Sequence, residues 1–266
     1  MPDFIDQTGR TISLPHIPKR IVSLVPSQTE LLADLGLSPE VVGITRFCIH
    51  PVAWSGTKTI VGGTKQVKMD VINMLQPDLI IANKEENVKE QVEALEKQFP
   101  VWVSDVNKLP DACEMIGQIG LMTNKENAAD ELISRIKEKF AQRAAAIKKD
   151  SILPAAYFIW QNPYMLTGGD TFINSMMDAA GFKNIFADRS RYPIATVEEI
   201  RTCNPELLLL SSEPFPFAEK HIYGLQQLFP AAKIILVDGE MFSWYGSRLQ
   251  YAPAYFARLQ EQILQK

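Results

Sequence analysis

One long stretch of the sequence, residues 123–150, constrains the fold more than any other part of it. Its apolar residues recur at intervals of three and four, along one face of a helix: Ala129, Leu132, Ile133, Ile136, Phe140, Ala144 and Ile147. Because the other positions are mostly charged or polar, the pattern predicts one long amphipathic helix. Thr123 and Glu126 fit a capping box at its start, and Lys148 and Lys149 would oppose the helix dipole at its end.

Short apolar runs alternate with helical patterns on both sides of this stretch. Before it, the sequence predicts an edge hairpin in 1–19, strands over 20–25, 41–45, 79–82 and 101–103, and helices over 27–35 (capped by Ser27 and Glu30), 70–75 and 88–98. After it, we predict strands over 155–160, 184–186, 207–210 and 234–237, and helices over 172–180, 197–202, 222–228 and 253–264. Such alternation is typical of the α/β fold class, with parallel sheets covered by helices.

The two halves share a pattern that predicts an internal duplication. Residues 72–81 and 200–209 both read as a helix, a turn with proline and an acid, and a buried strand. A glutamate, Glu85 or Glu213, stands eight residues beyond each proline, Pro77 or Pro205. We therefore expect an N-terminal α/β lobe over 1–122, a linking helix over 123–150 and a C-terminal α/β lobe over 151–266.

Composition excludes several classes of protein. The chain has 266 residues, 46% of them hydrophobic, which suits one large domain or two lobes. A net charge of -4 without a long basic run argues against nucleic acid or an anionic membrane as the main partner. No apolar run is long enough to span a membrane. Cys48, Cys113 and Cys203 are scattered and odd in number, which indicates free thiols.

The first residues lack the basic and apolar regions of a signal peptide. As written, the sequence predicts a cytoplasmic protein. A periplasmic or surface-anchored location is expected instead if an export signal was removed.

Ligands of open α/β sheets bind outside the carboxyl ends of the strands, so the loops there are the candidate site. These loops are 26–29, 46–54, 83–87, 161–169, 211–217 and 239–248. Aromatic residues and methionines gather in or beside them: Trp54, Trp160, Tyr164, Met165, Phe215, Phe217, Met241, Phe242, Trp244 and Tyr245. They suit a flat apolar ligand, although several could belong to the core instead.

Polar groups in the same loops give further candidates. Cys48 and His50 would face the same way in an extended loop and could offer sulfur and nitrogen to one metal, or His50 alone could be an axial ligand. The alternative is a buried thiol beside a hydrogen-bonded imidazole. Glu213 would be a carboxylate in the cleft, paired with Arg248 or Arg46, or a solvated loop acid. GxGxxG, P-loop, GxSxG, HExxH and EF-hand patterns are absent, which argues against common hydrolases and nucleotide enzymes.

The segments RIVSLVPSQTELLADLG, from Arg20, and LQPDLI, from Leu75, with the opening DQTGRTISL, resemble the cobalamin- and ferric-siderophore-binding proteins of ABC importers. These are class III, helical-backbone, binding proteins. The resemblance covers nearly the whole chain. It implies two Rossmann-like α/β lobes joined by one long backbone helix, with a metal chelate held between them. It also implies that an acid on each lobe, Asp70 and Glu198, docks to an ABC permease.

The missing leader favours a leaderless, cytoplasmic branch of this family. The leading hypothesis is a monomeric, non-enzymatic binding protein for a cobalamin-like corrinoid, a ferric siderophore or haem, with no obligatory cofactor. Its expected ligand-binding residues are His50 (also the tentative metal ligand), Trp160, Tyr164, Glu213, Phe215, Trp244, Tyr245 and Arg248. The alternative is a tetrapyrrole-handling or chelatase-like enzyme in which His50 and Glu213 deliver metal or act as acid and base. An exported importer component is the third hypothesis.

Overall fold

The structure is a computed structural model that describes residues 2–148 and 152–264. The chain divides into two compact units. Unit 1 comprises Met1–Val106, Pro110–Arg135 and Tyr245–Arg248, and unit 2 comprises Asn107–Leu109, Ile136–Trp244 and Leu249–Lys266. The boundary at Arg135 falls inside the long helix α5 (Glu126–Ala146), so each unit contains one part of that helix.

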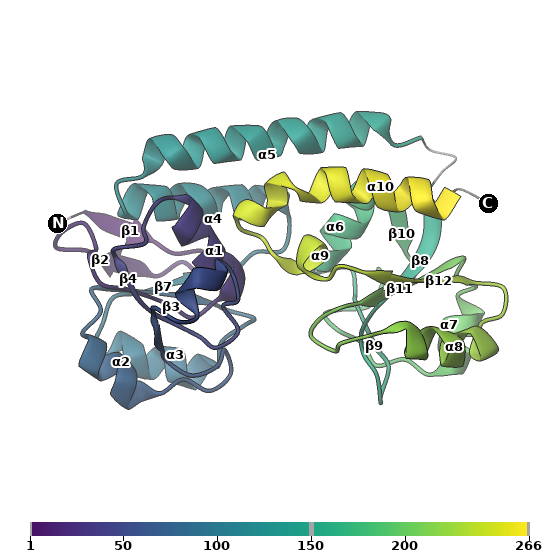
Figure 1. Ribbon diagram of the computed structural model, residues 1–266, viewed down its shortest axis with the longest axis horizontal. Helices are drawn as coiled ribbons and strands as arrows, with labels where there is room; N and C mark the ends of the chain where they lie inside the picture. Colours follow the sequence, from purple (N-terminus) through teal and green to yellow (C-terminus); the bar gives the residue numbers. More distant parts are fainter. Residues whose placement is uncertain (1, 149–151, 265–266) are drawn as a thin grey trace. The chain divides into compact units, whose positions relative to one another are not determined.

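Unit 1 is built on a parallel sheet in the order β5-β4-β3-β6-β7. Its strands are β3 (Ile21–Ser23), β4 (Val41–Ile44), β5 (Thr59–Ile60), β6 (Leu79–Asn83) and β7 (Val101–Ser104). Its helices before α5 are α1 (Pro26–Asp34), η1 (Val52–Trp54), α2 (Met69–Leu75), α3 (Lys89–Glu96) and α4 (Leu109–Met122). The predicted edge hairpin is the antiparallel pair β1 (Asp3–Ile5) and β2 (Thr11–Ser13). Figure 1 shows α2 and α3 together on one side of the sheet, where Ile72, Val92 and Leu95 pack against strand residues.

Unit 2 is built on four parallel strands in the order β10-β8-β11-β12, with β9 antiparallel to β8. Its strands are β8 (Leu153–Trp160), β9 (Met165–Leu166), β10 (Phe182–Asn184), β11 (Leu207–Ser211) and β12 (Lys233–Val237). Its helices after α5 are α6 (Phe172–Ala180), α7 (Val197–Thr202), α8 (Glu219–Leu228), α9 (Glu240–Ser243) and α10 (Ala252–Leu264). The short helix η3 (Ser247–Gln250) precedes α10 and is divided between the two units after Arg248. Ile200 of α7 and Leu225 of α8 pack in one core cluster with residues of β8, β11 and β12. Figure 1 shows both helices on the same side of this sheet.

The two sheets repeat one arrangement. The order β4-β3-β6-β7 in unit 1 corresponds to β10-β8-β11-β12 in unit 2, strand for strand in chain order. A left-handed residue, Gln76 (φ 45°) or Asn204 (φ 49°), precedes Pro77 or Pro205 in the turn before the equivalent strands. The residue after each proline donates an equivalent backbone hydrogen bond. The amide of Asp78 donates to the Arg20 carbonyl, and the amide of Glu206 donates to the Pro154 carbonyl. These matches support the duplication predicted from the sequence.

Two predicted helix starts are wrong. The hydroxyl of Thr123 donates to the Ile119 carbonyl at 2.6 Å, so Thr123 closes α4 and does not cap α5, which begins at Glu126. Helix α1 begins at Pro26 after Val25, without a side-chain cap, and its Ser27 is buried. The helix α4 was not predicted, although Ala112, Met115, Ile116, Ile119 and Met122 carry a clear helical spacing and are all buried.

The predicted apolar stripe of α5 is correct for most of its length. Ala129, Leu132, Ile136 and Phe140 are buried. In the last turn, however, Ala144 is exposed and Arg143 is buried instead. Helix α5 ends at Ala146, Lys148 follows it, and the predicted continuation through Lys149 and Asp150 lies outside the described residues. No helix in the described part of the chain is long and apolar enough to cross a membrane.

Arg143 is buried because it completes the end of another helix. Its guanidinium donates to the carbonyls of Ala179 and Ala180 in the last turn of α6, at 3.3 and 2.8 Å, and to Gln260 Oε1 of α10 at 2.7 Å. The last carbonyls of a helix have no partner within the helix, so a buried donor there satisfies them. Arg143 thus connects three helices of unit 2.

We therefore predict that Arg143→Ala lowers the free energy of unfolding by about 2–4 kcal/mol, because it leaves buried carbonyls without a donor. Urea unfolding followed by circular dichroism measures this. The matched control is Arg135→Ala on the same helix, whose half-exposed side chain makes only a 3.9 Å contact with Glu131 and should change stability by less than about 0.5 kcal/mol. Equal effects of the two substitutions would contradict the prediction.

Candidate functional site

Each sheet has a switch point at its centre. From β3 the chain continues to β4 on one side and later reaches β6 on the other, and β8 has the same relation to β10 and β11. Connections leave such a pair of strands in opposite directions, which opens a crevice at their carboxyl ends. The residues that follow β3, β4 and β6 in unit 1, and β8, β11 and β12 in unit 2, therefore form the candidate site of each unit.

In unit 1, the loop after β6 is fixed by amide side chains. Asn83 Oδ1 accepts from the backbone amides of Glu85 and Glu86, at 2.8 and 2.9 Å, and Asn87 donates to the carbonyls of Leu24 and Thr64. Asn83 and Asn87 are almost fully buried. They give this loop a defined shape, and Glu85 and Glu86 are partly buried within it.

The loop after β4 differs from the extended geometry predicted for it. Cys48 is 2% exposed, and its sulfur lies 3.0 and 3.2 Å from the hydroxyls of Thr29 and Thr45. Burial raises the pKa of this thiol. His50 is only partly buried, and the loop turns around residues 46–47 instead of running extended. The extended loop on which the predicted Cys48–His50 pair depends is therefore wrong, and the buried thiol matches the alternative expected from the sequence. The thiol anchors the loop to Thr29 and Thr45.

This anchoring leaves three apolar side chains at the surface that the sequence did not single out. Phe47, Ile49 and Val52 are 52%, 50% and 75% exposed. Trp54, predicted at the rim, is instead 5% exposed and packs under the Lys58 ammonium. The loop thus presents apolar side chains to solvent, while its Cys48 and Trp54 side chains are buried.

Arg248 forms an ion pair with Glu30, not with Glu213. Its Nη2 lies 2.6 Å from Glu30 Oε1 and its Nε 2.9 Å from Oε2, and both side chains are mostly buried. Burial raises the pKa of Glu30, against the opposing effects of the Arg248 guanidinium and, more weakly, of His50. Because His50 acts on this carboxylate, the predicted site residues His50 and Arg248 both belong to the surroundings of Glu30 in unit 1.

In unit 2, the carboxylate of Glu213 accepts two hydrogen bonds from its own unit. Ser243 Oγ and Trp244 Nε1 donate to its Oε1 at 2.6 and 3.0 Å. Burial raises the pKa of Glu213, and the charges of Glu240 and Asp238 raise it further, against these two hydrogen bonds. The structure therefore brings the predicted residues Glu213 and Trp244 together, with neutral donors in place of the arginine expected from the sequence.

Aromatic side chains form a ledge at the ends of β8 and β11. Trp160, the last residue of β8, is 40% exposed, and its ring centroid lies 5.5 Å from that of Phe215. The Phe215 ring also packs against the rings of Phe217 and His221, with centroid distances of 4.7 and 5.4 Å. Tyr164 packs edge-on against Phe158, 5.5 Å away. Of these, Trp160 and Phe215 are the predicted site residues that form the outer part of the ledge.

Other predicted aromatic residues belong to the interior. Phe242 is fully buried among Tyr157, Tyr255 and Phe256, and Phe217 is 6% exposed. Trp244 and Tyr245 are each 6% exposed. Rings in the loops after strands are thus divided between core and surface, a division that sequence position alone does not reveal.

The two acids expected to dock a permease lie on equivalent helices. Asp70 is an exposed residue in the first turn of α2. Glu198 occupies the first turn of α7, with a side chain that is 80% exposed and lies 2.9 Å from Arg201. Their accessibility agrees with a docking role, which remains a prediction.

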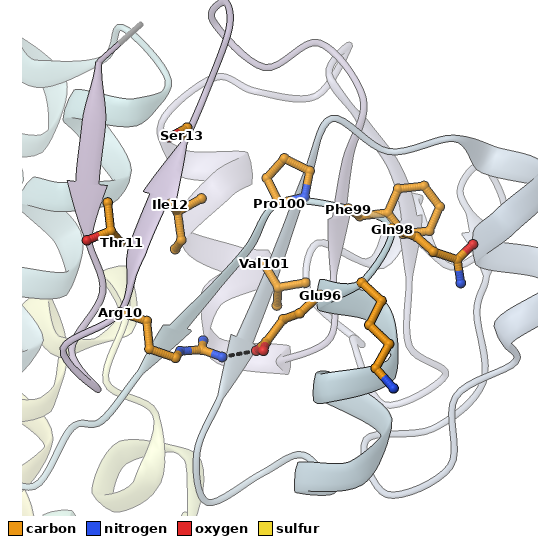
Figure 2. Close-up of a pocket in the computed structure, with 10 residues that line it drawn as sticks. Arg10, Thr11, Ile12, Ser13, Glu96, Gln98, Phe99, Pro100 and Val101 are labelled. Carbon is orange, nitrogen blue, oxygen red and sulfur yellow. Dashed lines mark ion pairs between the residues drawn. The ribbon is translucent and has the colours of Figure 1, made fainter.

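A cavity of about 400 Å³ lies elsewhere in unit 1, between β2 and the segment that enters β7. Figure 2 shows its lining, with the Arg10–Glu96 ion pair across one end. None of the predicted site residues lines it. It opens beside Pro100 and Val101, at the amino end of β7, which is the opposite end of the sheet from the crevice described above.

A family model described as periplasmic binding protein matches residues 21–229. The chain belongs to the periplasmic binding protein family. Among related proteins, an ABC transporter substrate-binding lipoprotein of Bacillus subtilis is 30% identical over 77% of this chain and 67% of its own length. A vitamin B12-binding protein of Vibrio parahaemolyticus is 25% identical over 73% of this chain and 70% of its own length.

A solved structure extends the comparison to the fold. The periplasmic vitamin B12 binding protein of Vibrio cholerae superimposes with a TM-score of 0.79, covering 95% of this chain and all of that chain, at 18% identity. At this identity the likeness shows the fold alone. It confirms the predicted α/β fold class, and the family model confirms the predicted resemblance to periplasmic binding proteins.

The side chains of the described residues do not form a site for a bare metal ion. No three or more of their histidine, cysteine, aspartate or glutamate side chains gather closely enough to hold one. His50 as a metal ligand therefore stays a prediction that needs a metal bringing its own donors, as a chelate does.

The environment of Glu213 gives a prediction for the pH dependence of stability. Because its folded pKa lies above the ordinary 4.5, the folded chain binds more protons than the unfolded chain between pH 4.5 and the raised value. The contribution of Glu213 to the free energy of unfolding therefore falls as pH rises through this window. Glu213→Gln does not titrate and lacks this fall.

Urea unfolding of both proteins between about pH 4 and pH 8 measures this contribution. The difference in free energy of unfolding, wild type minus variant, should decrease with rising pH and then level off. A difference that increases with pH would show that the folded carboxylate is stabilised as an anion.

Proposed function

We propose that this chain is the substrate-binding protein of an ABC transporter and that its ligand is a metal chelate, either a cobalamin-like corrinoid, haem or a ferric siderophore. Membership of the periplasmic binding protein family supports a binding role. Two relatives support the finer statement, since one is named as an ABC transporter substrate-binding lipoprotein and another as a vitamin B12-binding protein.

The observation that carries the proposal is the aromatic ledge of unit 2. Trp160 is partly exposed although it ends a buried strand. Phe215 packs edge-on against its ring, and His221 in turn contacts Phe215. A large exposed ring costs free energy in water unless something covers it, and a flat macrocycle offers a matching face. The ledge lies at the carboxyl ends of β8 and β11, where open α/β sheets bind ligands.

Chelates suit these surroundings better than a free ion. A chelate supplies its own metal donors, so the protein needs only apolar surface and a few hydrogen-bonding groups. Unit 2 offers the ledge beside the Glu213 carboxylate, and unit 1 offers the exposed edge of the loop after β4. In this proposal the chain binds and releases its ligand without catalysis, and family membership gives no support to the chelatase-like alternative.

Titration with cyanocobalamin, haem and ferrichrome, followed by tryptophan fluorescence and isothermal calorimetry, tests the proposal. We expect saturable binding of at least one chelate at about micromolar concentration or below. Trp160→Ala should weaken that binding about tenfold or more, because the ring provides a large contact area. The control is Tyr223→Ala, which removes a ring that is 74% exposed on α8 of the same unit and should leave affinity unchanged. Absence of heat and of spectral change with all three chelates would refute the proposed function.

Docking to a permease is a separate part of the proposal. Asp70 and Glu198 present carboxylates on equivalent helices of the two units, where permease arginines could pair with them. Asp70→Lys and Glu198→Lys should each weaken binding to the transporter about tenfold, because each replaces attraction by repulsion. Binding to vesicles that contain the permease and ATPase of the cognate ABC transporter measures the effect.

The control is Glu131→Lys, which reverses an equally exposed charge on α5. If all three variants bind alike, Asp70 and Glu198 do not dock. The cytoplasmic location and the monomeric state expected from the sequence stay predictions.

A further inference from the structure

Unit 1 contains one arginine whose guanidinium has no acid or carbonyl partner among the described residues. Arg10 pairs with Asp6 and Glu96, Arg20 donates to carbonyls at the end of α2, Arg135 lies near Glu131, and Arg248 pairs with Glu30. Arg46, by contrast, is exposed and its guanidinium contacts only the ring of Phe47. Its hydrogen-bond donors therefore face solvent.

Packing positions this guanidinium without using its donors. Its central carbon lies 5.6 Å from the centroid of the Phe47 ring. Gly63 lies beside both side chains, because an added Cβ there would come 3.4 Å from Arg46 Nε and Nη2 and 3.1 Å from the Phe47 ring. The backbone amide of Arg46 is held at 2.8 Å by the Gly62 carbonyl. A guanidinium that packs over an aromatic ring spends none of its N–H donors on that contact, so they are available for an anion.

Arg46 lies at the edge of the sheet where open α/β sheets bind their ligands. It follows β4, which is next to β3 in the sheet, so it lies at the carboxyl edge near the switch point. Phe47, Ile49 and Val52 form an exposed apolar edge in the same loop. The buried Cys48 holds the loop to Thr29 and Thr45, so the cation and the apolar edge are presented together on a fixed support.

We propose that Arg46 donates hydrogen bonds to an anionic oxygen, of a carboxylate or a phosphate, on the chelate that this protein binds. This inference rests on the proposed function and narrows it to chelates that combine an apolar body with an anionic group. Phe47 and its neighbours contact the body, and Arg46 selects for the charge. A charge-assisted hydrogen bond of this kind contributes about tenfold or more in affinity.

Two pairs of chelates that differ in the anionic group provide the test. Haem carries two propionates, which its dimethyl ester lacks, and cyanocobalamin carries a phosphodiester, which dicyanocobinamide lacks. Affinities are measured for the wild type, Arg46→Gln, Arg46→Lys and the control Arg135→Gln, which removes the same charge from α5 of unit 1. A preference for haem over its ester that Arg46→Gln removes would identify a carboxylate. A preference for cyanocobalamin over dicyanocobinamide, which also lacks the ribose and base, identifies a phosphate only where Arg46→Gln removes it.

We expect the wild type to prefer the anionic member of one pair by about tenfold or more, and Arg46→Gln to remove that preference while binding of the neutral member stays unchanged. Arg46→Lys should restore part of the preference because it keeps the charge but not the planar fork. Arg135→Gln should behave as the wild type. Two results would overturn the role of Arg46 and leave the proposed function intact. One is an Arg46→Gln variant that loses affinity equally for both members of the pair, and the other is a wild type that binds both members with equal affinity. Binding of ferrichrome alone, which carries no carboxylate or phosphate, would also overturn the role of Arg46. Failure of the wild type to bind ferrichrome and all four of these chelates would refute the proposed function itself.

Discussion

The pairing of the central parallel strands is the constraint on which the rest of the structure depends. Strands β6 and β11 consist of side chains that are fully or almost fully buried, because helices cover both faces of each sheet. Such strands cannot carry chemistry along their length. Polar and exposed aromatic groups are therefore confined to the loops at the strand ends, and the switch points beside β3 and β8 determine which of those loops meet. The duplicated strand order places an equivalent crevice in each unit.

Periodicity was sufficient to predict the fold, because buried strands and amphipathic helices leave a local trace in the sequence. Helix ends were less predictable, since a Ser or Thr three residues before a Glu can cap the next helix, close the previous one or have neither role. Thr123 closes the preceding helix and Glu30 forms an ion pair with a residue near the end of the chain. Arg143 shows the same limit, because the carbonyls that make its burial favourable belong to α6, far away in sequence.

The candidate site could be located from the sequence, but its contacts could not. Parallel strands bring their carboxyl ends to one edge, so the loops were predictable from strand positions alone. Which cation meets which acid depends on tertiary packing: Glu213 accepts from Ser243 and Trp244, and Arg248 pairs with Glu30. The exposure of Phe47, Ile49 and Val52 was likewise hidden, because an apolar residue beside a strand is more often core.

The segment after α9 shows why neighbouring residues can have separate roles. Trp244 belongs to unit 2 and donates to Glu213, whereas Tyr245–Arg248 belongs to unit 1. The main chain of this segment lies so close to α1 that a Cβ on Gly246 would come 2.4 Å from the Ser27 carbonyl oxygen, so only glycine fits there. Two residues on, Arg248 is fixed by Glu30. The backbone is thus held by a buried carboxylate in each unit, Glu213 before the crossing and Glu30 after it. Each candidate site thus has its own anchor in this segment, so residues adjacent in sequence complete the surroundings of two different carboxylates.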